Sequence, residues 1–237
     1  MKTQDRQNKN KLFDLLKKLI KAIRPHKVLD GEAINVRGNA TAGDSSSVQS
    51  YYGNATAGDY SVVKSWQGEA KGGFDSAVKS TKGNATAGNF SAVKSEGRNA
   101  TGGYCSAVFS DCGDATGGRH SAVQARKGNA TAGGRSAVGA NGDSTAGDWS
   151  AVRSQCGDAT GGTWSAVWSK EGNATAGEGS AAVSYGGMAT VGDSSIARGK
   201  TVQLGMGSVG VIANEKGAIT EVVIRSKKII KVTYLIE

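Results

Sequence analysis

The chain has 237 residues, enough for one large domain or two small ones. Its composition excludes an ordinary thick hydrophobic core, because 36 residues are glycine, 6% are aromatic and one is proline. The net charge of +9 belongs to the ends: residues 1–37 carry ten basic and four acidic residues, residues 216–237 carry five and two, and the middle carries fourteen of each. A neutral middle argues against a basic groove along the chain, so we expect no nucleic-acid partner.

The first predicted element is an amphipathic helix inside a polar N-terminal region, residues 1–37. Leu12, Leu16, Leu19 and Ile23 recur at helical spacing, lysines take the other side, and Pro25 ends the helix. Three roles fit: a cap over the repeats that follow, which we favour, a helix that trimerises or docks on a partner, and a basic helix on a membrane surface.

The lysines in this segment interrupt its apolar run. We therefore expect neither a signal peptide nor a membrane span. A cytoplasmic location is the default expectation, and the surface of a virion or cell would have to be reached by a route without a signal.

Residues 38–201 repeat one unit of about fifteen residues eleven times, with the consensus G-N-A-T-A-G-x-x-S-A-V-x-S-x-x. We number each coil from its first residue, position 1; one coil, 128–141, is a residue short. So short a period leaves room for two short strands and two turns, and stacked coils pair strand on strand at about 4.8 Å. The sequence therefore predicts an all-β fold, a single parallel β-solenoid or β-roll of about eleven coils.

Alternation within the strands predicts which side chains fill the interior. The two alanines of N-A-T-A share one face, and the valine at position 11 is the most uniform bulky apolar residue, so these should point inward together with the serines beside the valine. Buried serines then need hydroxyl ladders from coil to coil. We expect the glycine after A-T-A, at position 6, to turn a tight corner with positive φ.

The pattern fades over residues 202–216, which we interpret as a transition coil within a C-terminal region, residues 202–237. Residues 218–236 read AITEVVIRSKKIIKVTYLI, two β-rich segments around a polar turn that predict a β-hairpin. Because the open end of a solenoid invites edge-to-edge stacking, we expect this hairpin to cap it.

Patterns typical of catalysis or metal binding are missing from the sequence. His26 and His120 have no visible nucleophile or carboxylate arrangement around them, and Cys105, Cys112 and Cys156 lack metal-ligand spacing and fit a reduced setting. We therefore expect no enzyme activity, no metal and no cofactor.

Aromatic side chains stand out because they fall at corners or outward strand positions. They indicate a contact surface, although shielding of the edges of a thin core would also place rings there. An outward column of alanines at position 10, which lets another surface approach closely, favours the contact surface. The candidate binding residues are Trp149, Trp164, Trp168, Phe109, Tyr104, Trp66, Tyr60 and Phe90, of which the first three are expected to form one patch.

The threonine column at position 4 is broken only at Lys71. Stacked threonines are typical of β-strands, whose surfaces favour β-branched residues. A flat and regular threonine face is also typical of ice-binding proteins, so ice-binding (antifreeze) activity is the alternative function.

The coil resembles the head repeat of the YadA-like trimeric autotransporter adhesins, whose pattern is A-x-A-x-G-x-x-S-V-A-I-G. The resemblance spans about residues 38–201, and its closest stretch reads Ala189-Thr-Val-Gly192-Asp-Ser-Ser195-Ile-Ala-Arg-Gly199. The resemblance implies a left-handed parallel β-roll and a homotrimer. The coil here is mostly fifteen residues long where the family has fourteen, and we expect no signal, coiled-coil stalk or membrane anchor.

Taken together, these observations predict a non-enzymatic protein-binding or structural repeat protein that acts through the outer face of the solenoid. We expect a homo-oligomer and a protein partner whose identity the sequence does not reveal. A phage or mobile-element factor that binds a host protein fits this description, and so does a fibre or adhesin-like component.

Overall fold

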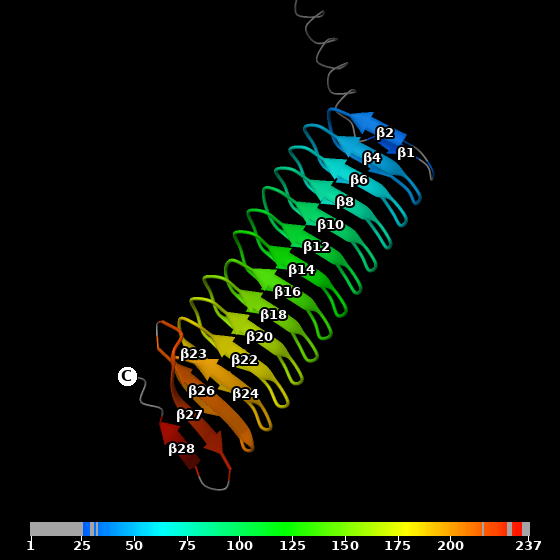
Figure 1. The fold of residues 1–237 in the computed structure, drawn as a ribbon. Helices are drawn as coiled ribbons and strands as arrows, with labels where there is room; N and C mark the ends of the chain where they lie inside the picture. The colour runs from blue at the N-terminus through cyan, green and yellow to red at the C-terminus, as the bar shows by residue number, and fades with distance from the viewer. Residues whose placement is uncertain (1–25, 29–30, 32, 215, 227–228, 234–237) are drawn as a thin grey trace, which may run out of the picture.

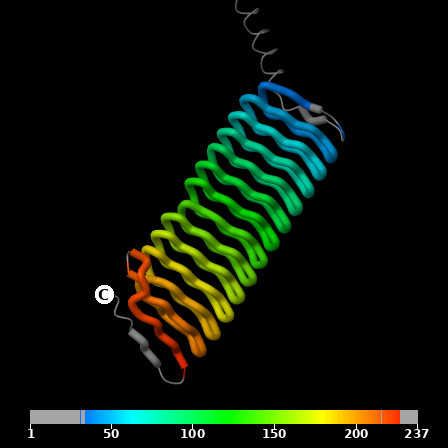
Figure 2. Tube along the Cα trace, viewed as in Figure 1, coloured from blue at the N-terminus to red at the C-terminus, as the bar shows by residue number. Residues whose placement is uncertain are grey.

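In the computed structural model, the described residues (26–28, 31, 33–214, 216–226 and 229–233) form a β-solenoid. The chain winds around a narrow interior, each turn stacked on the one before, and the stack forms an almost straight rod (Figures 1 and 2). The all-β parallel solenoid predicted from the repeat is confirmed. No helix occurs within the described residues, and the predicted amphipathic helix, residues 8–24, lies outside them.

Each turn contributes one strand to each of two sheets, which we call sheet A (13 strands) and sheet B (15 strands). Sheet A contains β1 (His26–Val28), β3 (Ala40–Ala42), β5 (Ala55–Thr56), β7 (Ala70–Lys71), β9 (Ala85–Thr86), β11 (Ala100–Thr101), β13 (Ala115–Thr116), β15 (Ala130–Thr131), β17 (Ser144–Thr145), β19 (Ala159–Thr160), β21 (Ala174–Ala176), β23 (Met188–Val191) and β25 (Thr201–Leu204). Sheet B contains β2 (Ala33–Val36), β4 (Ser47–Ser50), β6 (Val62–Ser65), β8 (Ala77–Ser80), β10 (Ala92–Ser95), β12 (Ala107–Ser110), β14 (Ala122–Ala125), β16 (Ala137–Ala140), β18 (Ala151–Ser154), β20 (Ala166–Ser169), β22 (Ala181–Ser184), β24 (Ile196–Gly199), β26 (Ser208–Ala213), β27 (Ile219–Arg225) and β28 (Ile229–Thr233).

Equivalent positions of neighbouring coils pair with each other. Val93 of β10, for example, pairs in parallel with Val78 of β8 and with Val108 of β12. The valines at position 11 and the alanines at position 3 are buried, as predicted, in one core cluster that runs along the rod. Ile34 and Leu204 are buried in the end turns. Between these turns the core consists of valine, alanine and serine side chains, so it is thin.

Two columns of buried serines satisfy backbone groups inside the rod. At position 9, the backbone N–H of Ser61 donates to Oγ of Ser76 in the next coil at 3.2 Å, and the contact repeats along the stack. At position 13, the Ser95 hydroxyl donates to the carbonyl of Gly83 at 2.9 Å and accepts the N–H of Arg98 at 3.1 Å. The expected coil-to-coil ladder is therefore found at position 9, whereas position 13 ties a sheet-B strand to the position-1 residues on either side of it.

The glycine at position 6 does not have the positive φ that we expected. The left-handed conformation falls two residues later, at position 8, where Tyr60 (φ 55°), Phe90 (φ 57°) and Trp149 (φ 58°) turn the corner. Position 6 needs glycine for another reason: a Cβ on Gly73 would lie 2.0 Å from Oδ1 of Asp59 in the preceding coil. Close approach between coils, and not backbone conformation, selects glycine there.

Asn and Asp side chains at position 2 form a ladder on the outside of sheet A. Oδ1 of Asn99 accepts the N–H of Asp114 at 2.9 Å, and Oδ1 of Asp114 accepts the N–H of Asn129 at 2.9 Å. The same bond recurs in other coils, from Asn39 to Asn173. These side chains therefore hold one coil to the next, as well as covering the surface of the sheet.

The short coil, residues 128–141, departs from the consensus, and the next coil compensates in part. Position 13 is Ala140 there and Ala125 in the coil before, so two serine hydroxyls are missing. Ser144 replaces the usual alanine at position 3 of the next coil, is fully buried, and donates to the carbonyl of Arg153 at 2.6 Å. Position 12 of the short coil is Gly139, where a Cβ would meet no atom within 4 Å, so packing does not require glycine at this place.

The solenoid extends past the predicted coils at both ends. β1 and β2 form a turn before Gly38, and β25 and β26 form another after Gly199. The chain then reverses, because β27 pairs antiparallel with β26 and β28 pairs antiparallel with β27. This C-terminal hairpin prolongs sheet B alone, while sheet A ends at β25 (Figure 1).

Candidate functional site

Three columns of side chains form the outer surface of sheet B, with one side chain of each column in every coil. Position 8 lies at the corner before the strand. Positions 10 and 12 point outward from the strand, because positions 11 and 13 of the same strand are buried. Positions 10 and 12 are joined by two residues of extended chain and lie roughly 6.6 Å apart, whereas position 8 lies on the other side of position 10, at the corner, where the backbone has positive φ. We call these three columns, over residues 53–171, the sheet-B face.

An aromatic ladder borders the sheet-B face at the corner. Its rings come from five successive coils, at position 8 or at the adjacent position 7, and pack edge to face with centroids 5.2–5.7 Å apart. The members are Tyr60, Phe74, Phe90, Tyr104 and His120. Their mutual packing leaves Tyr60 60% exposed and Phe90 50% exposed, so the ladder is a surface and not part of the core.

Two tryptophans continue this border in later coils. Trp149 and Trp164 both lie at position 8, and their rings stack with centroids 5.6 Å apart and an interplanar angle of 16°. Gly179, at position 8 of the following coil, lies against the Trp164 ring, where a Cβ would approach Cε3 to 2.8 Å. Arg135 occupies position 8 between the ladder and this pair.

Trp168 does not join the other two tryptophans, so the expected patch of three is split. Trp168 lies at position 12, where its ring packs against Tyr185 at 6.0 Å and the Arg153 guanidinium lies 4.7 Å from its centroid. Phe109 also lies at position 12, with Lys94 Nζ 5.7 Å from its centroid. Trp66 lies at the opposite corner, after β6. The structure thus places Tyr60, Phe90, Tyr104, Trp149 and Trp164 on one border, Phe109 and Trp168 on the other, and Trp66 outside the face.

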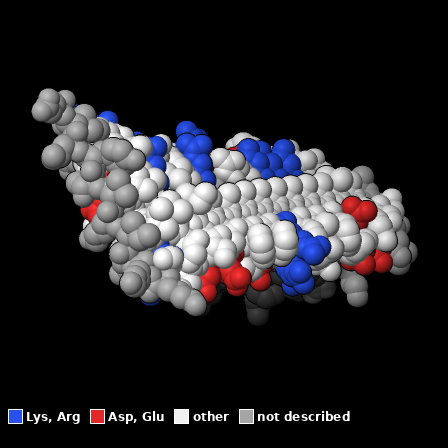
Figure 3. Space-filling view, turned by 60° about the horizontal axis from the view of Figure 1, so that its bottom comes forward, with Lys and Arg blue, Asp and Glu red and all other residues white. Residues whose placement is uncertain are grey.

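A shallow groove with a volume of about 850 Å³ runs along the rod over positions 10–12 of the sheet-B face. The space-filling view shows rows of small uncharged side chains along the rod, with Lys and Arg gathered beside them (Figure 3). The charged residues that line the groove are all basic: Lys64, Lys79, Lys94 and Arg153. Its floor is the position-10 column, exposed in every coil, which consists of Val62, Ala77, Ala92, Ala107, Ala122, Ala137, Ala151 and Ala166.

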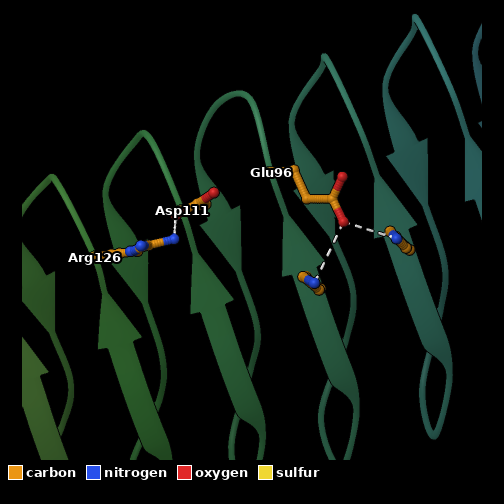
Figure 4. A network of polar contacts seen from close by, with 5 residues as sticks. Glu96, Asp111 and Arg126 are labelled. Atoms are coloured by element: carbon orange, nitrogen blue, oxygen red, sulfur yellow. Dashed lines mark hydrogen bonds and ion pairs between the residues drawn. The ribbon is translucent and has the colours of Figure 1, made fainter.

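Acidic residues at position 14 hold some of the neighbouring cations in place. Glu96 Oε1 pairs with Lys79 Nζ at 2.7 Å and with Lys94 Nζ at 3.3 Å (Figure 4). The hydrogen bond from Lys79 and then that from Lys94 outweigh the effect of burial and lower the pKa of Glu96. Arg126 and Asp111 form a similar pair between adjacent coils at 3.3 Å.

The groove opens sideways at the short coil. Because Gly139 has no side chain, the position-12 column is interrupted between Gln124 and Arg153, and a notch of about 260 Å³ opens there. Gln124, Asn141 and Gln155 bring amide groups to its walls, and Arg126 and Arg153 bring guanidinium groups. The repeat consensus indicates neither this notch nor the basic border; in the sequence, the missing residue of coil 128–141 is the sign of the notch.

The chemistry of the sheet-B face is that of stacked rings, methyl groups and cations. Among the described residues, no three His, Cys, Asp or Glu side chains gather where they could hold a metal ion. The three cysteines are exposed and form no disulfide. Within the same residues, no helix is long and apolar enough to cross a membrane.

Support for a family comes from the repeat motif alone. No protein-family model, no curated protein and no solved structure matches this chain. The resemblance of residues 38–201 to YadA-like heads stays a prediction, and the function has to be argued from the sheet-B face.

Proposed function

We propose that this chain is a non-enzymatic protein-binding or structural repeat protein that acts through the sheet-B face. The observation that carries the proposal is the exposed position-10 column, eight residues long, open to solvent between an aromatic and a basic border. Contiguous apolar strips of this kind mark contact surfaces, because they leave methyl groups and rings in water. Aromatic and arginine side chains beside such a strip are the residue types that contribute most to binding between proteins.

The shape of the groove favours a protein partner over a small ligand. Small molecules bind in concave pockets that bury most of their surface, whereas this groove is long, shallow and floored by alanine. Its cations are partly engaged, since Glu96 pairs with both Lys79 and Lys94. A nucleic acid would need a longer run of cations with fewer carboxylates beside them.

Ice binding is the second candidate, and the threonine column on sheet A favours it. Thr101, Thr116 and Thr131 are exposed in successive coils and pair in strict parallel register. The adjacent position-2 column is less suited to ice, because Oδ1 of Asn99 and its equivalents already accept a backbone N–H. Sheet A thus offers a single threonine column with no second column beside it that could bind ice. For this reason we favour protein binding over ice binding.

The first test blocks the floor of the groove. Ala107→Arg with Ala137→Arg places two long cations on the floor, and the matched control, Thr101→Arg with Thr131→Arg, places the same charges on sheet A. We expect the groove variant to lose association with any partner, measured by affinity capture and light scattering, while the control keeps it. Circular dichroism and thermal unfolding verify that both variants fold. Unchanged association of the groove variant, or thermal hysteresis of the wild-type chain, would contradict the proposal.

A further inference from the structure

We infer that the sheet-B face binds a second copy of this chain. The two rods lie face to face, point in the same direction and are in register, about a twofold axis that runs along the alanine column. This inference rests on the proposed function and names the partner of the same face.

The regular spacing of the floor is the first argument for a second copy. The position-10 side chains recur once per coil over eight coils, at the spacing of the strands. A partner covers such a floor along its whole length only if its own side chains recur at the same interval. A second copy satisfies this condition, and small residues on both sides let the two sheets approach within about 10 Å.

Positions 8 and 12 lie on opposite sides of the position-10 column, which makes the face self-complementary under one particular symmetry. A twofold axis along position 10 exchanges the two borders, because a rotation of 180° about that axis exchanges the two sides of the column. Position 8 of each copy then lies over position 12 of the same coil in the other copy. The aromatic border of one rod therefore faces the basic border of its partner.

In six of the eight coils of the face, a ring at position 8 or at the adjacent position 7 (Phe74 and Tyr104) corresponds to a cation or a ring at position 12. Within one chain these two borders lie on opposite sides of the position-10 floor, so contact within the chain does not explain the match. A cation facing an aromatic ring across the interface is stabilised by the ring quadrupole. The ring–cation combinations are Tyr60 with Lys64, Phe74 with Lys79, Phe90 with Lys94 and Trp149 with Arg153, and the ring–ring combinations are Tyr104 with Phe109 and Trp164 with Trp168.

The short coil supplies a steric match. Its position 8 is Arg135, and its position 12 is Gly139, the one position-12 residue of the sheet-B face without a side chain. Packing within the chain leaves this glycine unexplained, since a Cβ there would meet nothing within 4 Å. In the paired arrangement, Arg135 of the other copy enters the notch beside Gly139.

The walls of the notch can receive a guanidinium group. Gln124 and Gln155 bring side-chain oxygens to its walls as acceptors, and Oδ1 of Asn141, which accepts from Cys156 Sγ at 3.3 Å, has a second lone pair. Of the two arginines of the notch, Arg126 is paired with Asp111 at 3.3 Å, and the Arg153 guanidinium lies against the Trp168 ring.

Other symmetries use this face less well. An antiparallel twofold with full overlap lays position 12 over position 12; it brings Lys64 opposite Trp168 and Lys94 opposite Gly139, but it also brings Lys79 opposite Arg153, a repulsive pair. A threefold needs two different contact surfaces on each rod, whereas a twofold uses the same patch on both. The face measures roughly 34 Å by 20 Å with its borders, about 700 Å² per rod, close to the ~800 Å² per partner of a standard specific interface.

The decisive experiment fills the notch and then empties the opposing position. Sedimentation velocity should show the 24.1 kDa wild-type chain in a concentration-dependent equilibrium with a dimer. Gly139→Trp should weaken the dimer at least tenfold without changing the circular dichroism spectrum, and adding Arg135→Gly to it should restore dimerisation. Arg135→Gly alone serves as the matched control and should dimerise. Failure of the double variant to recover would overturn the arrangement.

Crosslinking tests the direction of the two rods. In a background with Cys105→Ser, Cys112→Ser and Cys156→Ser, Ala77→Cys should be joined to its own copy by a short bismaleimide. Antiparallel rods would instead join Ala77→Cys chains to Ala151→Cys chains, because two residues 77 would then be roughly 24 Å apart. Crosslinking of residue 77 to residue 151 would overturn the inference. So would a trimer, or a monomer at every concentration, in sedimentation. The groove and threonine variants decide the proposed function separately, since they also report binding to other proteins.

Discussion

The outer faces of sheets A and B differ although the same coil builds both. Typical sheet-A strands are two residues long, such as β11 (Ala100–Thr101), and their surface consists of threonines beside Asn and Asp side chains that bond to the next coil. Typical sheet-B strands are four residues long, such as β12 (Ala107–Ser110), and their surface consists of alanines between rings and cations. The outer side chains of sheet A therefore hold neighbouring coils together, whereas those of sheet B are exposed to solvent.

This difference explains where the repeat can vary. On sheet A, the position-2 oxygen is needed by the backbone of the next coil, so nearly all coils keep Asn or Asp there. On sheet B, the strand ladder and the inward serines satisfy the backbone, so the side chains at positions 8 and 12 are not needed for hydrogen bonds between coils. Position 12 accordingly ranges from Lys64 through Gly139 to Trp168.

The largest expected effect separates the inside of sheet B from the outside of sheet A within one coil. Val108→Asp places a carboxylate in the core, where Val108 is 3% exposed and has no charged partner, and should cost more than about 4 kcal/mol of unfolding free energy. Thr101→Asp, on the exposed surface of β11, should cost about 1 kcal/mol or less. Chemical denaturation of both variants measures the difference. Equal losses would mean that the valine column is not the core.

A smaller effect concerns the serines that tie the two sheets together. Ser95→Ala removes the hydroxyl that bonds Gly83 and Arg98, so the buried carbonyl of Gly83 and the partly buried N–H of Arg98 lose a partner, and we expect a loss of about 1–3 kcal/mol. Ala125 occupies the same position in its own coil, so Ala125→Ser should leave stability unchanged or raise it by up to about 1 kcal/mol. Thermal unfolding of the pair checks both. A stable Ser95→Ala variant would show that position 13 matters only for packing.

The regular part of this fold was predictable because each position recurs in many coils. Valines such as Val93 and Val123 are nearly constant, so alternation identified the core without any reference to structure. The exposed alanine column followed from the same alternation. Comparing the coils of this one chain distinguishes constant positions from variable ones, as an alignment of related sequences would.

The parts that were missed depend on contacts between coils, which a consensus does not show. The need for glycine at Gly73 comes from Asp59 in the preceding coil, and the positive φ at Tyr60 belongs to a position that varies in sequence. The separation of Trp168 from Trp164 could not be read from sequence distance, because four residues cross the whole sheet-B face. The notch at Gly139 required knowing that no neighbouring atom fills it.

The smallest expected effect lies on the basic border, at Glu96. Its pKa is lowered in the folded chain, first by Lys79, so the ion pair adds stability above the unfolded-state pKa, and this contribution is lost as the pH falls through the folded-state pKa. Lys79→Met should raise the pKa of Glu96 toward its ordinary value and reduce stability at neutral pH by less than about 1 kcal/mol, with no difference in acid. Nuclear magnetic resonance titration of Glu96 and denaturation at several pH values measure both effects. Lys64→Met removes a cation from the same column outside this ion pair and should leave the titration unchanged; an equal response of the two variants would show that the charge of the whole border, and not the pair, sets the pKa.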